Sequence, residues 1–180
     1  MKRALLSLAI LLSAAVLWAG CNNPASSTPA ASSSSDEGWI NVTNITHAQP
    51  KLPTLKLYMG AEALDAEMAL TPREDEVGMM YRTNIQETDA MIFNLGSPTQ
   101  ASFWMKNCPE SISAAYISPD GVIQEIHHLE QNDTNPVLSA QNNIQFVLET
   151  REGWFQRHNV GVGTLIKPEQ GSLTDDLRLR

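Results

Sequence analysis

Short runs of alternating apolar and polar residues recur from Leu52 onward, and they constrain the fold more than any other feature of the chain. Residues 54–59 alternate, Gly60-Ala61 follows as a turn, and residues 63–70 alternate again. Because successive side chains of a strand point to opposite faces, this pattern predicts a hairpin with one buried face.

A second hairpin is predicted where residues 112–117 and 122–129 are joined by the turn Ser118-Pro119-Asp120-Gly121. Residues 91–93 form an apolar run without alternation, which is typical of a strand covered on both faces. Gly96-Ser97-Pro98 is expected to end that strand. The remaining expected elements are a polar loop at 131–143, a strand at 144–149, a helical turn near 152–157 and a strand at 163–166.

Thr71-Pro72-Arg73-Glu74 has the residue order of a helix start. A Thr N-cap, Pro at the first helical position and Glu at the third make a capping box, which predicts a short helix running to about Met80. Many short strands, two short helices and no strand–helix–strand repeat predict an α+β fold. We expect a mostly antiparallel, curled β-sheet or small barrel.

The N-terminus has the order of a bacterial secretory signal, in which Lys2 and Arg3 precede an apolar run over residues 4–17. The run ends at Trp18-Ala19-Gly20-Cys21, which resembles the lipobox of bacterial lipoproteins, although Trp18 stands where Leu, Val or Ile is usual. The resemblance implies that Cys21 carries a lipid and becomes the mature N-terminus. Simple signal cleavage with Cys21 free, or an uncleaved anchor, is the alternative.

Four segments are therefore expected: a signal peptide at 1–20, the lipidated Cys21 with a flexible tether at 21–50, one globular domain at 51–168 and a frayed tail at 169–180. The expected location is outside the cytoplasm, with the lipid anchor in a membrane and the domain facing the periplasm or the cell exterior.

The net charge and the cysteine content limit which molecules the protein can bind and which disulfides it can form. Cleavage after residue 20 removes the two positive charges of Lys2 and Arg3, so the formal net charge falls from −8 to −10. An acidic surface of this kind disfavours binding to nucleic acid or to anionic lipid headgroups. With Cys21 lipidated, Cys108 has no partner for an internal disulfide.

Residues 103–108, Phe-Trp-Met-Lys-Asn-Cys, combine large apolar side chains with a Lys, an Asn and a thiol, as a binding site would. If the segment is a strand, Trp104 and Lys106 share one face while Phe103 and Met105 share the other. One face can then pack the core and the other can form a site wall.

The order of motifs resembles the domain-of-unknown-function 192 family of small bacterial and archaeal proteins. The resemblance rests on the motifs Thr71-Pro72 with Glu74, Gly78-Met79-Met80 with Arg82, Asp89 with Met91-Ile92-Phe93, Phe103-Trp104-Met105-Lys106-Asn107, Asp120-Gly121, Val147-Leu148-Glu149 and Gly163. The family has no established activity, so the resemblance supports the fold and the site location alone. Two departures stand out: Cys108 replaces the usual Thr, and Gly163-Thr164 replaces Gly-Asp.

The candidate ligand-binding residues are Trp104, Lys106, Asn107, Arg82 and Glu149. If the helix end meets the Trp104 segment, a guanidinium, an ammonium and an amide converge beside an aromatic wall, which suits a small anionic ligand or the chain terminus of a protein partner. Alternatively, Arg82 pairs with Glu74 or Glu149 and Lys106 is solvated. An enzyme that uses Lys106, and a structural interaction domain of the cell envelope, remain open as functions.

Other chemistries have weaker support. Cys108 with His127, His128 or His158 is disfavoured as a nucleophile pair because the similar family has Thr in place of the thiol. Glu125 and His127 share a strand face, but two ligands are too few for a metal site. We therefore expect no metal and no cofactor, and no catalytic residue is assigned.

Overall fold

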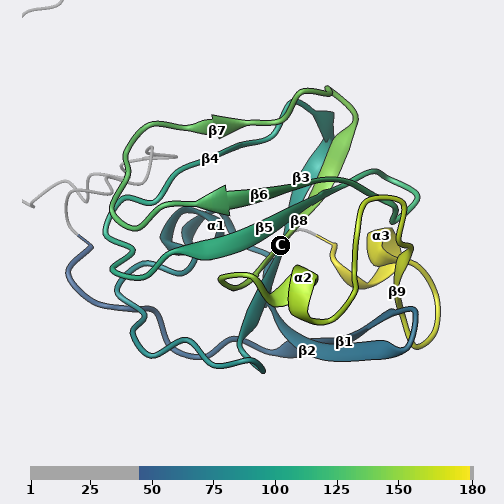
Figure 1. Cartoon of the computed structure of the whole chain (residues 1–180), viewed down its shortest axis with the longest axis horizontal. Coiled ribbons are helices and arrows are strands. Elements are labelled where there is room, and N and C mark those ends of the chain that lie inside the picture. Colours follow the sequence, from purple (N-terminus) through teal and green to yellow (C-terminus); the bar gives the residue numbers. More distant parts are fainter. Residues whose placement is uncertain (1–44, 179–180) are drawn as a thin grey trace, which may run out of the picture. The chain divides into compact units, whose positions relative to one another are not determined.

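A seven-stranded sheet forms the body of the domain in this computed structural model, which describes residues 45–178. The strand order is β6-β5-β8-β3-β2-β1-β9. Figure 1 shows the sheet curling, so that the fold is a β-rich half-barrel with a few short helices. The sheet strands are β1 (Thr54–Met59), β2 (Glu62–Ala69), β3 (Ala90–Thr99), β5 (Ile112–Ile117), β6 (Ile123–Leu129), β8 (Ile144–Arg151) and β9 (Ile166–Pro168).

The other elements lie outside this sheet. Strands β4 (Ser102–Phe103) and β7 (Val137–Leu138) pair as a separate two-stranded ribbon. The helices are α1 (Pro72–Val77), α2 (Trp154–Arg157) and α3 (Leu173–Asp176). In the described part of the chain, no helix is long and apolar enough to cross a membrane.

Both predicted hairpins are present. Strands β1 and β2 pair with Leu57 opposite Leu64, and β5 and β6 pair with Ile112 opposite Leu129. Antiparallel pairing predominates, as predicted, but β2 and β3 are parallel and are connected by way of α1. This crossover carries the chain from one strand to its neighbour and leaves α1 beside the sheet.

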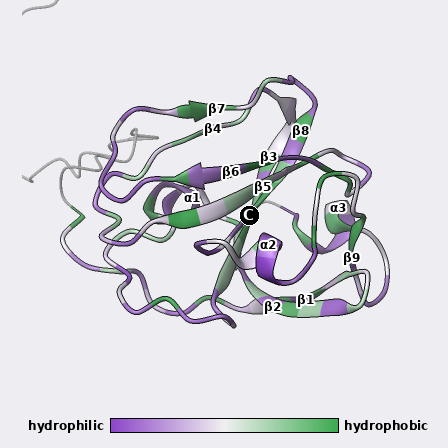
Figure 2. Cartoon of the chain, in the orientation of Figure 1, coloured by the Kyte–Doolittle hydropathy of each residue, from purple (hydrophilic) through white to green (hydrophobic). Residues whose placement is uncertain are grey.

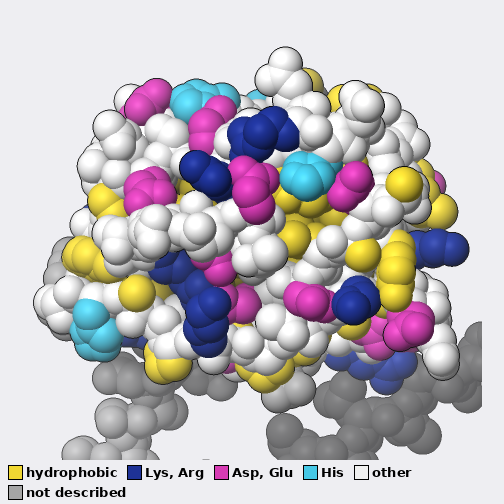
Figure 3. Space-filling view, turned by 60° about the horizontal axis from the view of Figure 1, so that its bottom comes forward, with side chains coloured by type: hydrophobic (Ala, Val, Ile, Leu, Met, Phe, Trp, Pro, Cys, Tyr) yellow, Lys and Arg dark blue, Asp and Glu magenta, His cyan; other side chains and the backbone are white. Residues whose placement is uncertain are grey.

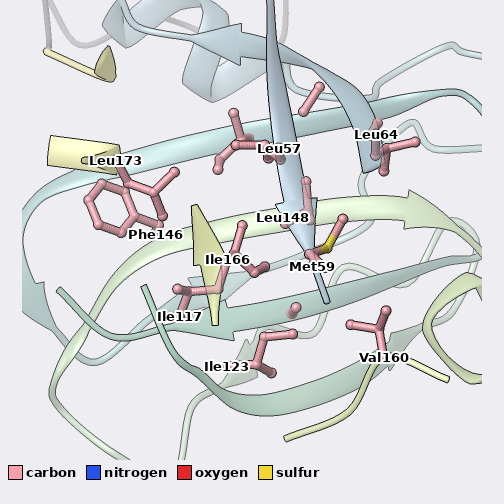
Figure 4. Packing of buried hydrophobic residues seen from close by; sticks show 14 of the residues in the cluster. Leu57, Met59, Leu64, Ile117, Ile123, Phe146, Leu148, Val160, Ile166 and Leu173 are labelled. Atoms are coloured by element: carbon pink, nitrogen blue, oxygen red, sulfur yellow. The ribbon is translucent and has the colours of Figure 1, made fainter. Parts of the chain in front are cut away.

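Two buried clusters pack on opposite faces of the sheet. Alternation along β8 places Phe146 and Leu148 in one cluster and Val147 in the other. Figure 4 shows the first cluster, in which Leu148 lies close to Leu57 and Ile166. The second cluster holds Val77 of α1 and Met91 and Phe93 of β3. Strand β6 is at one edge, and Figure 2 shows its arrowhead in the hydrophilic colour.

Helix α1 begins as predicted and ends earlier. Glu74 N donates to Thr71 Oγ1 over 3.2 Å and Thr71 N donates to Glu74 Oε2 over 2.9 Å, which completes the capping box. The helix stops at Val77 because Gly78 adopts a φ of 47°, and its N–H closes the last turn on Glu74 O. The prediction that it runs to about Met80 was therefore wrong.

Two predicted strand limits were also wrong. Strand β3 continues through Gly96-Ser97-Pro98 to Thr99, with an irregular register between Asn94 and Thr99. Residues 104–108 are not a strand, since β4 ends at Phe103.

Residues expected to be flexible or frayed pack on the domain at both ends of the described chain. Ile45 is buried, and Gln49 Nε2 donates to Gly78 O over 2.9 Å. At the other end, Leu173 and Leu177 are buried, so the frayed tail predicted for residues 169–180 was wrong for this part. The signal peptide, Cys21 and the tether up to residue 44 lie outside the described residues.

Candidate functional site

The segment after β4 turns away from the sheet and is fixed by backbone hydrogen bonds. Met105 N donates to Asp133 O over 2.7 Å, and Cys108 N donates to Met105 O over 3.1 Å. Asn107 takes a φ of 59°, which Asn tolerates better than most residues. Met105 is buried while Trp104 keeps 37% of its surface exposed. Met105 therefore packs in the core and Trp104 faces outward, although the segment is not a strand.

Lys106 and Asn107 lie beside Trp104 and the end of α1. Lys106 Nζ is 5.3 Å from the centroid of the Trp104 ring, which is within the range of a cation–π contact. Tyr81 N donates to Asn107 O over 2.8 Å. The segment that follows α1 thus meets the Trp104 segment, as the sequence argument required.

Arg82 does not join Lys106. Its guanidinium donates two hydrogen bonds, of 2.5 and 2.7 Å, to the carboxylate of Glu67 in β2, and both side chains are largely buried. Burial opposes ionisation of Glu67, but the bonds from Arg82 and from Leu52 N outweigh it and lower the pKa of the carboxyl. The protein partner of Arg82 is thus Glu67 and not the expected Glu74 or Glu149.

A small pocket opens beside Trp104. Its volume is about 40 Å³, and a neighbouring hollow of about 190 Å³ shares four of its lining residues. The shared residues are Asp75, Glu76, Phe103 and Trp104. The smaller pocket is further lined by residues 77–80 together with Phe93, Cys108 and Glu149. Among these described lining residues there are three carboxylates and no Lys or Arg.

Glu149 reaches this pocket from the middle of the sheet. It pairs with Met91 of β3 and with Ala114 of β5, so it projects on the same face as Val147, into the second cluster. It is only 4% exposed, and no hydrogen bond within residues 45–178 involves its carboxyl, which borders the pocket. The one fully buried side-chain atom without a hydrogen-bond partner in that range is Arg82 Nε. Burial, followed by the charge of Asp75, raises the pKa of Glu149 to about 8, although Arg82 acts in the opposite direction.

The rim of the pocket is also acidic. Asp75 and Glu76 are consecutive in α1, and Asp75 stays exposed while it lines the pocket. Desolvation and the charge of Glu76 raise the pKa of Asp75. The residue types of α1 gave no functional signal in the sequence, since acids near a helix N-terminus are expected for stability alone.

Nucleophilic and metal chemistry find no support at this site. Burial, with a contribution from Glu149, raises the pKa of the Cys108 thiol to about 12, so the thiolate that a nucleophile needs is disfavoured. Nε2 of His127, which was considered as its partner, instead lies 2.8 Å from Glu125 Oε2, and the imidazole packs at a tilt against the Tyr116 ring. No grouping of three or more metal-ligating side chains occurs within residues 45–178.

Comparison with known proteins bears on the family and the fold. Residues 55–168 match the DUF192 family model, described as uncharacterized ACR. A proposed transcription regulator from Sinorhizobium meliloti 1021 is similar in structure, with a TM-score of 0.62, 24% identity and coverage of 67% of this chain and 98% of that one. A protein of unknown function from Novosphingobium aromaticivorans DSM 12444 is also similar in structure, with a TM-score of 0.61 and 23% identity. The match covers 72% of this chain and 99% of that one.

At such identities the two structures show the fold alone. No match was found among curated proteins. The family model covers more than half of the chain and includes every residue of the pocket, and the protein therefore belongs to the DUF192 family of uncharacterized proteins.

Proposed function

We propose that the protein is a binding module of the cell envelope. Its ligand would enter the pocket beside Trp104 and donate a hydrogen bond to the carboxyl of Glu149. One observation carries this proposal: Glu149 is only 4% exposed, its carboxyl lines a pocket, and none of the hydrogen bonds among the described residues involves that carboxyl. A carboxyl that is largely removed from water and receives no hydrogen bond from the protein is poorly compensated, and a ligand that donates to it in the pocket would improve this.

The charge of the lining decides between donor-bearing ligands and the small anionic ligand expected from the sequence. Asp75 and Glu76 would repel an anion at short range, whereas Arg82 is already paired with Glu67. On the face drawn in Figure 3, acidic and basic side chains are interspersed, without a broad basic patch. A ligand that offers hydroxyl or amine groups is the better match.

The indole of Trp104 supplies the second half of the site. An aromatic ring that is partly exposed beside a polar pocket offers apolar contact area together with a fixed edge. The role of Lys106 in this arrangement is contact with the indole, and among the described residues no acid pairs with its ammonium group. This favours binding over an enzyme that uses Lys106 as an acid or base.

A ligand screen on the full-length protein tests the proposal. Chemical shifts and Trp fluorescence are recorded for small amines, polyols and carboxylates with the wild type, Glu149→Gln and Trp104→Ala. We expect donor-bearing compounds to perturb the wild type and to lose most of their effect in both variants. Glu169→Gln is the control, since Glu169 is exposed and does not line the pocket. Binding only of carboxylates, or binding that ignores Glu149, would contradict the proposal.

A further inference from the structure

We propose that the group recognised by this pocket is a primary ammonium, with Glu149 as its counter-ion and the Trp104 indole as its wall. This inference rests on the proposed function and specifies the chemistry of its ligand. It is carried by three features of the described residues: the size of the pocket, its charge and the behaviour of Lys106 beside it.

Size limits what can reach Glu149. A cavity needs roughly 10–15 Å³, counted as space for the centre of a water-sized sphere, to hold one water molecule, so about 40 Å³ accepts roughly three or four heavy atoms. An aminomethyl end fits this space, whereas a sugar ring does not. The rest of the ligand would lie in the neighbouring hollow of about 190 Å³, which is lined by Thr99, Gln100 and Ser102 in addition to the shared residues.

Charge favours a cation over a neutral donor. Glu149 lies inside the pocket and Asp75 and Glu76 lie along it, and no basic residue lines it to compensate them. A divalent metal would need a grouping of three or more ligands, and none exists in the described part of the chain. A single ammonium needs one close counter-ion and a few acceptors, which this arrangement provides.

Lys106 shows that the indole already attracts an ammonium. Its Nζ lies 5.3 Å from the ring centroid, at the distance of a cation–π contact. Lys106 itself does not line the pocket. Its ammonium therefore contacts the indole without pairing with the carboxyl of Glu149. A second ammonium within the pocket would use the same ring system and the carboxyl that Lys106 leaves unpaired.

Binding of an ammonium should release a proton. Burial raises the pKa of Glu149 to about 8, so the free protein at neutral pH holds this carboxyl mostly protonated. A cation placed against it favours the carboxylate, and the proton passes to solvent. Among the charges around it, Asp75 of α1 raises the pKa of Glu149 and Arg82 lowers it. Glu149 in turn raises the pKa of Cys108 and of Tyr116 in β5, while Glu76 also lines the pocket and Glu67 shares the face of the sheet.

Calorimetric titration of the full-length protein with n-butylammonium tests this directly. Titrations at pH 7 in two buffers of different ionisation enthalpy give the number of protons released. We expect close to one proton per ligand, and an affinity that rises by up to about tenfold per pH unit from pH 6 toward pH 8, since ionised Glu149 is the binding form. n-Butanol and butyrate serve as neutral and anionic ligands of the same length.

Three variants separate the possible roles. Glu149→Gln should weaken n-butylammonium binding at least tenfold and abolish proton release, while a melting temperature no lower than that of the wild type shows that it folds. Lys106→Ala should bind the ammonium equally well or better, because it removes a competing cation, whereas a site for anions would lose its ligand. Glu169→Gln should behave as the wild type.

A further binding experiment tests whether the ammonium belongs to a protein side chain or to a free amine. A short blocked peptide with a central Lys is compared with the same peptide carrying acetyl-lysine and with n-butylammonium. Binding of the Lys peptide, lost on acetylation and tighter than n-butylammonium, would indicate a protein side chain as the ligand, and the reverse order a free amine. If n-butanol binds in a Glu149-dependent manner without proton release, the ammonium inference fails and the proposed function stands. If nothing binds through Glu149, both fail.

Discussion

Glu149 places an ionisable carboxyl where the fold favours its neutral form, and this makes stability depend on pH. Its pKa is raised from an ordinary 4.5 to about 8, so the folded state binds more protons than the unfolded state between these values. Stability from this group is therefore fully present below about pH 4.5 and is lost as the pH rises toward 8. The slope is at most about 1.4 kcal/mol per pH unit.

Glu149→Gln should remove this loss. We expect the variant and the wild type to differ increasingly in free energy of unfolding, in favour of the variant, from pH 5 to pH 8, as measured by urea denaturation. A wild-type curve that runs parallel to that of the variant would show that Glu149 ionises normally in the folded protein.

Glu67 is a second buried glutamate on the same face, and the opposite sign is expected for it. Glu67 and Glu149 flank Met91 in the strand register, but Glu67 is ionised against Arg82 and its pKa is lowered. Glu67→Gln would leave the Arg82 guanidinium without its counter-ion, at a cost on the order of 3–5 kcal/mol at neutral pH. The free energies of unfolding of the two variants at pH 8 therefore distinguish a paired buried acid from an unpaired one. We expect Glu67→Gln to be less stable than the wild type and Glu149→Gln to be more stable, and equal destabilisation by both would contradict this.

The sequence pointed to Trp104, Lys106, Asn107, Arg82 and Glu149 as candidates but not to their partners, and it gave no sign of Glu67. Trp104, Lys106 and Asn107 are neighbours in the chain, so a local motif was enough to bring them together. The contact of Arg82 with Glu67 depends on the parallel pairing of β2 with β3, which alternation alone does not predict. Asp75 and Glu76 were missed for a related reason, since only the packing of α1 turns two ordinary helix-start acids into pocket residues.

Among the elements, the turn between β5 and β6 leaves no space for a side chain at Gly121. Gly121 adopts a φ of 84°, and a Cβ built there would lie 2.5 Å from the backbone oxygen of Ile166, which begins β9. Gly121 O also accepts a hydrogen bond from Ile166 N over 2.8 Å. The turn thus fastens the hairpin to the far end of the chain and leaves no room for a side chain.

Gly60, in the β1–β2 turn, is the matched control for this turn. It has a φ of 66° and nothing within 4 Å of an added Cβ. Gly60→Ala should cost only the strain of a positive φ, about 1 kcal/mol. Gly121→Ala should cost clearly more, because backbone must move as well. Urea denaturation measures both, and equal losses would mean that the contact with Ile166 yields without strain.

Local chemistry made the hairpins and the start of α1 predictable, and long-range contacts made the rest unpredictable. The capping box needs only residues within one helical turn, whereas the path of residues 104–108 is fixed by the bond of Met105 N to Asp133 O. The extension of β3 beyond Gly96 likewise depends on its pairing with β8, since Thr99 lies opposite Ile144.

For the whole molecule, the N-terminal sequence predicts export and a lipid anchor. The pattern of Lys2 and Arg3, an apolar run and Ala19-Gly20-Cys21 lies outside the described residues and stays a prediction. Mass spectrometry of the N-terminal peptide from native membranes should find residue 21 first, with a diacylglycerol mass on its sulfur. A first peptide that starts elsewhere and lacks a lipid would exclude the anchor, and Cys21→Ser should release the protein from membranes.

The last described residues complete the core, and their removal should weaken the whole domain. Leu173 and Leu177 are buried in the same cluster as Leu57 and Phe146, and Figure 4 shows Leu173 beside Phe146. Asn94 Nδ2 also donates to Leu177 O over 2.6 Å, which ties the C-terminal segment to β3.

Deletion of residues 169–180 removes both leucines and this hydrogen bond. A buried Leu replaced by Ala costs about 2–5 kcal/mol, so loss of the pair should take away much of the stability of a small domain. Deletion of residues 178–180 alone should change little, because among the described contacts it removes an exposed ion pair between Arg178 and Asp175. Urea denaturation of the two truncated proteins decides the matter, since equal midpoints would show that Leu173 and Leu177 add nothing to the core.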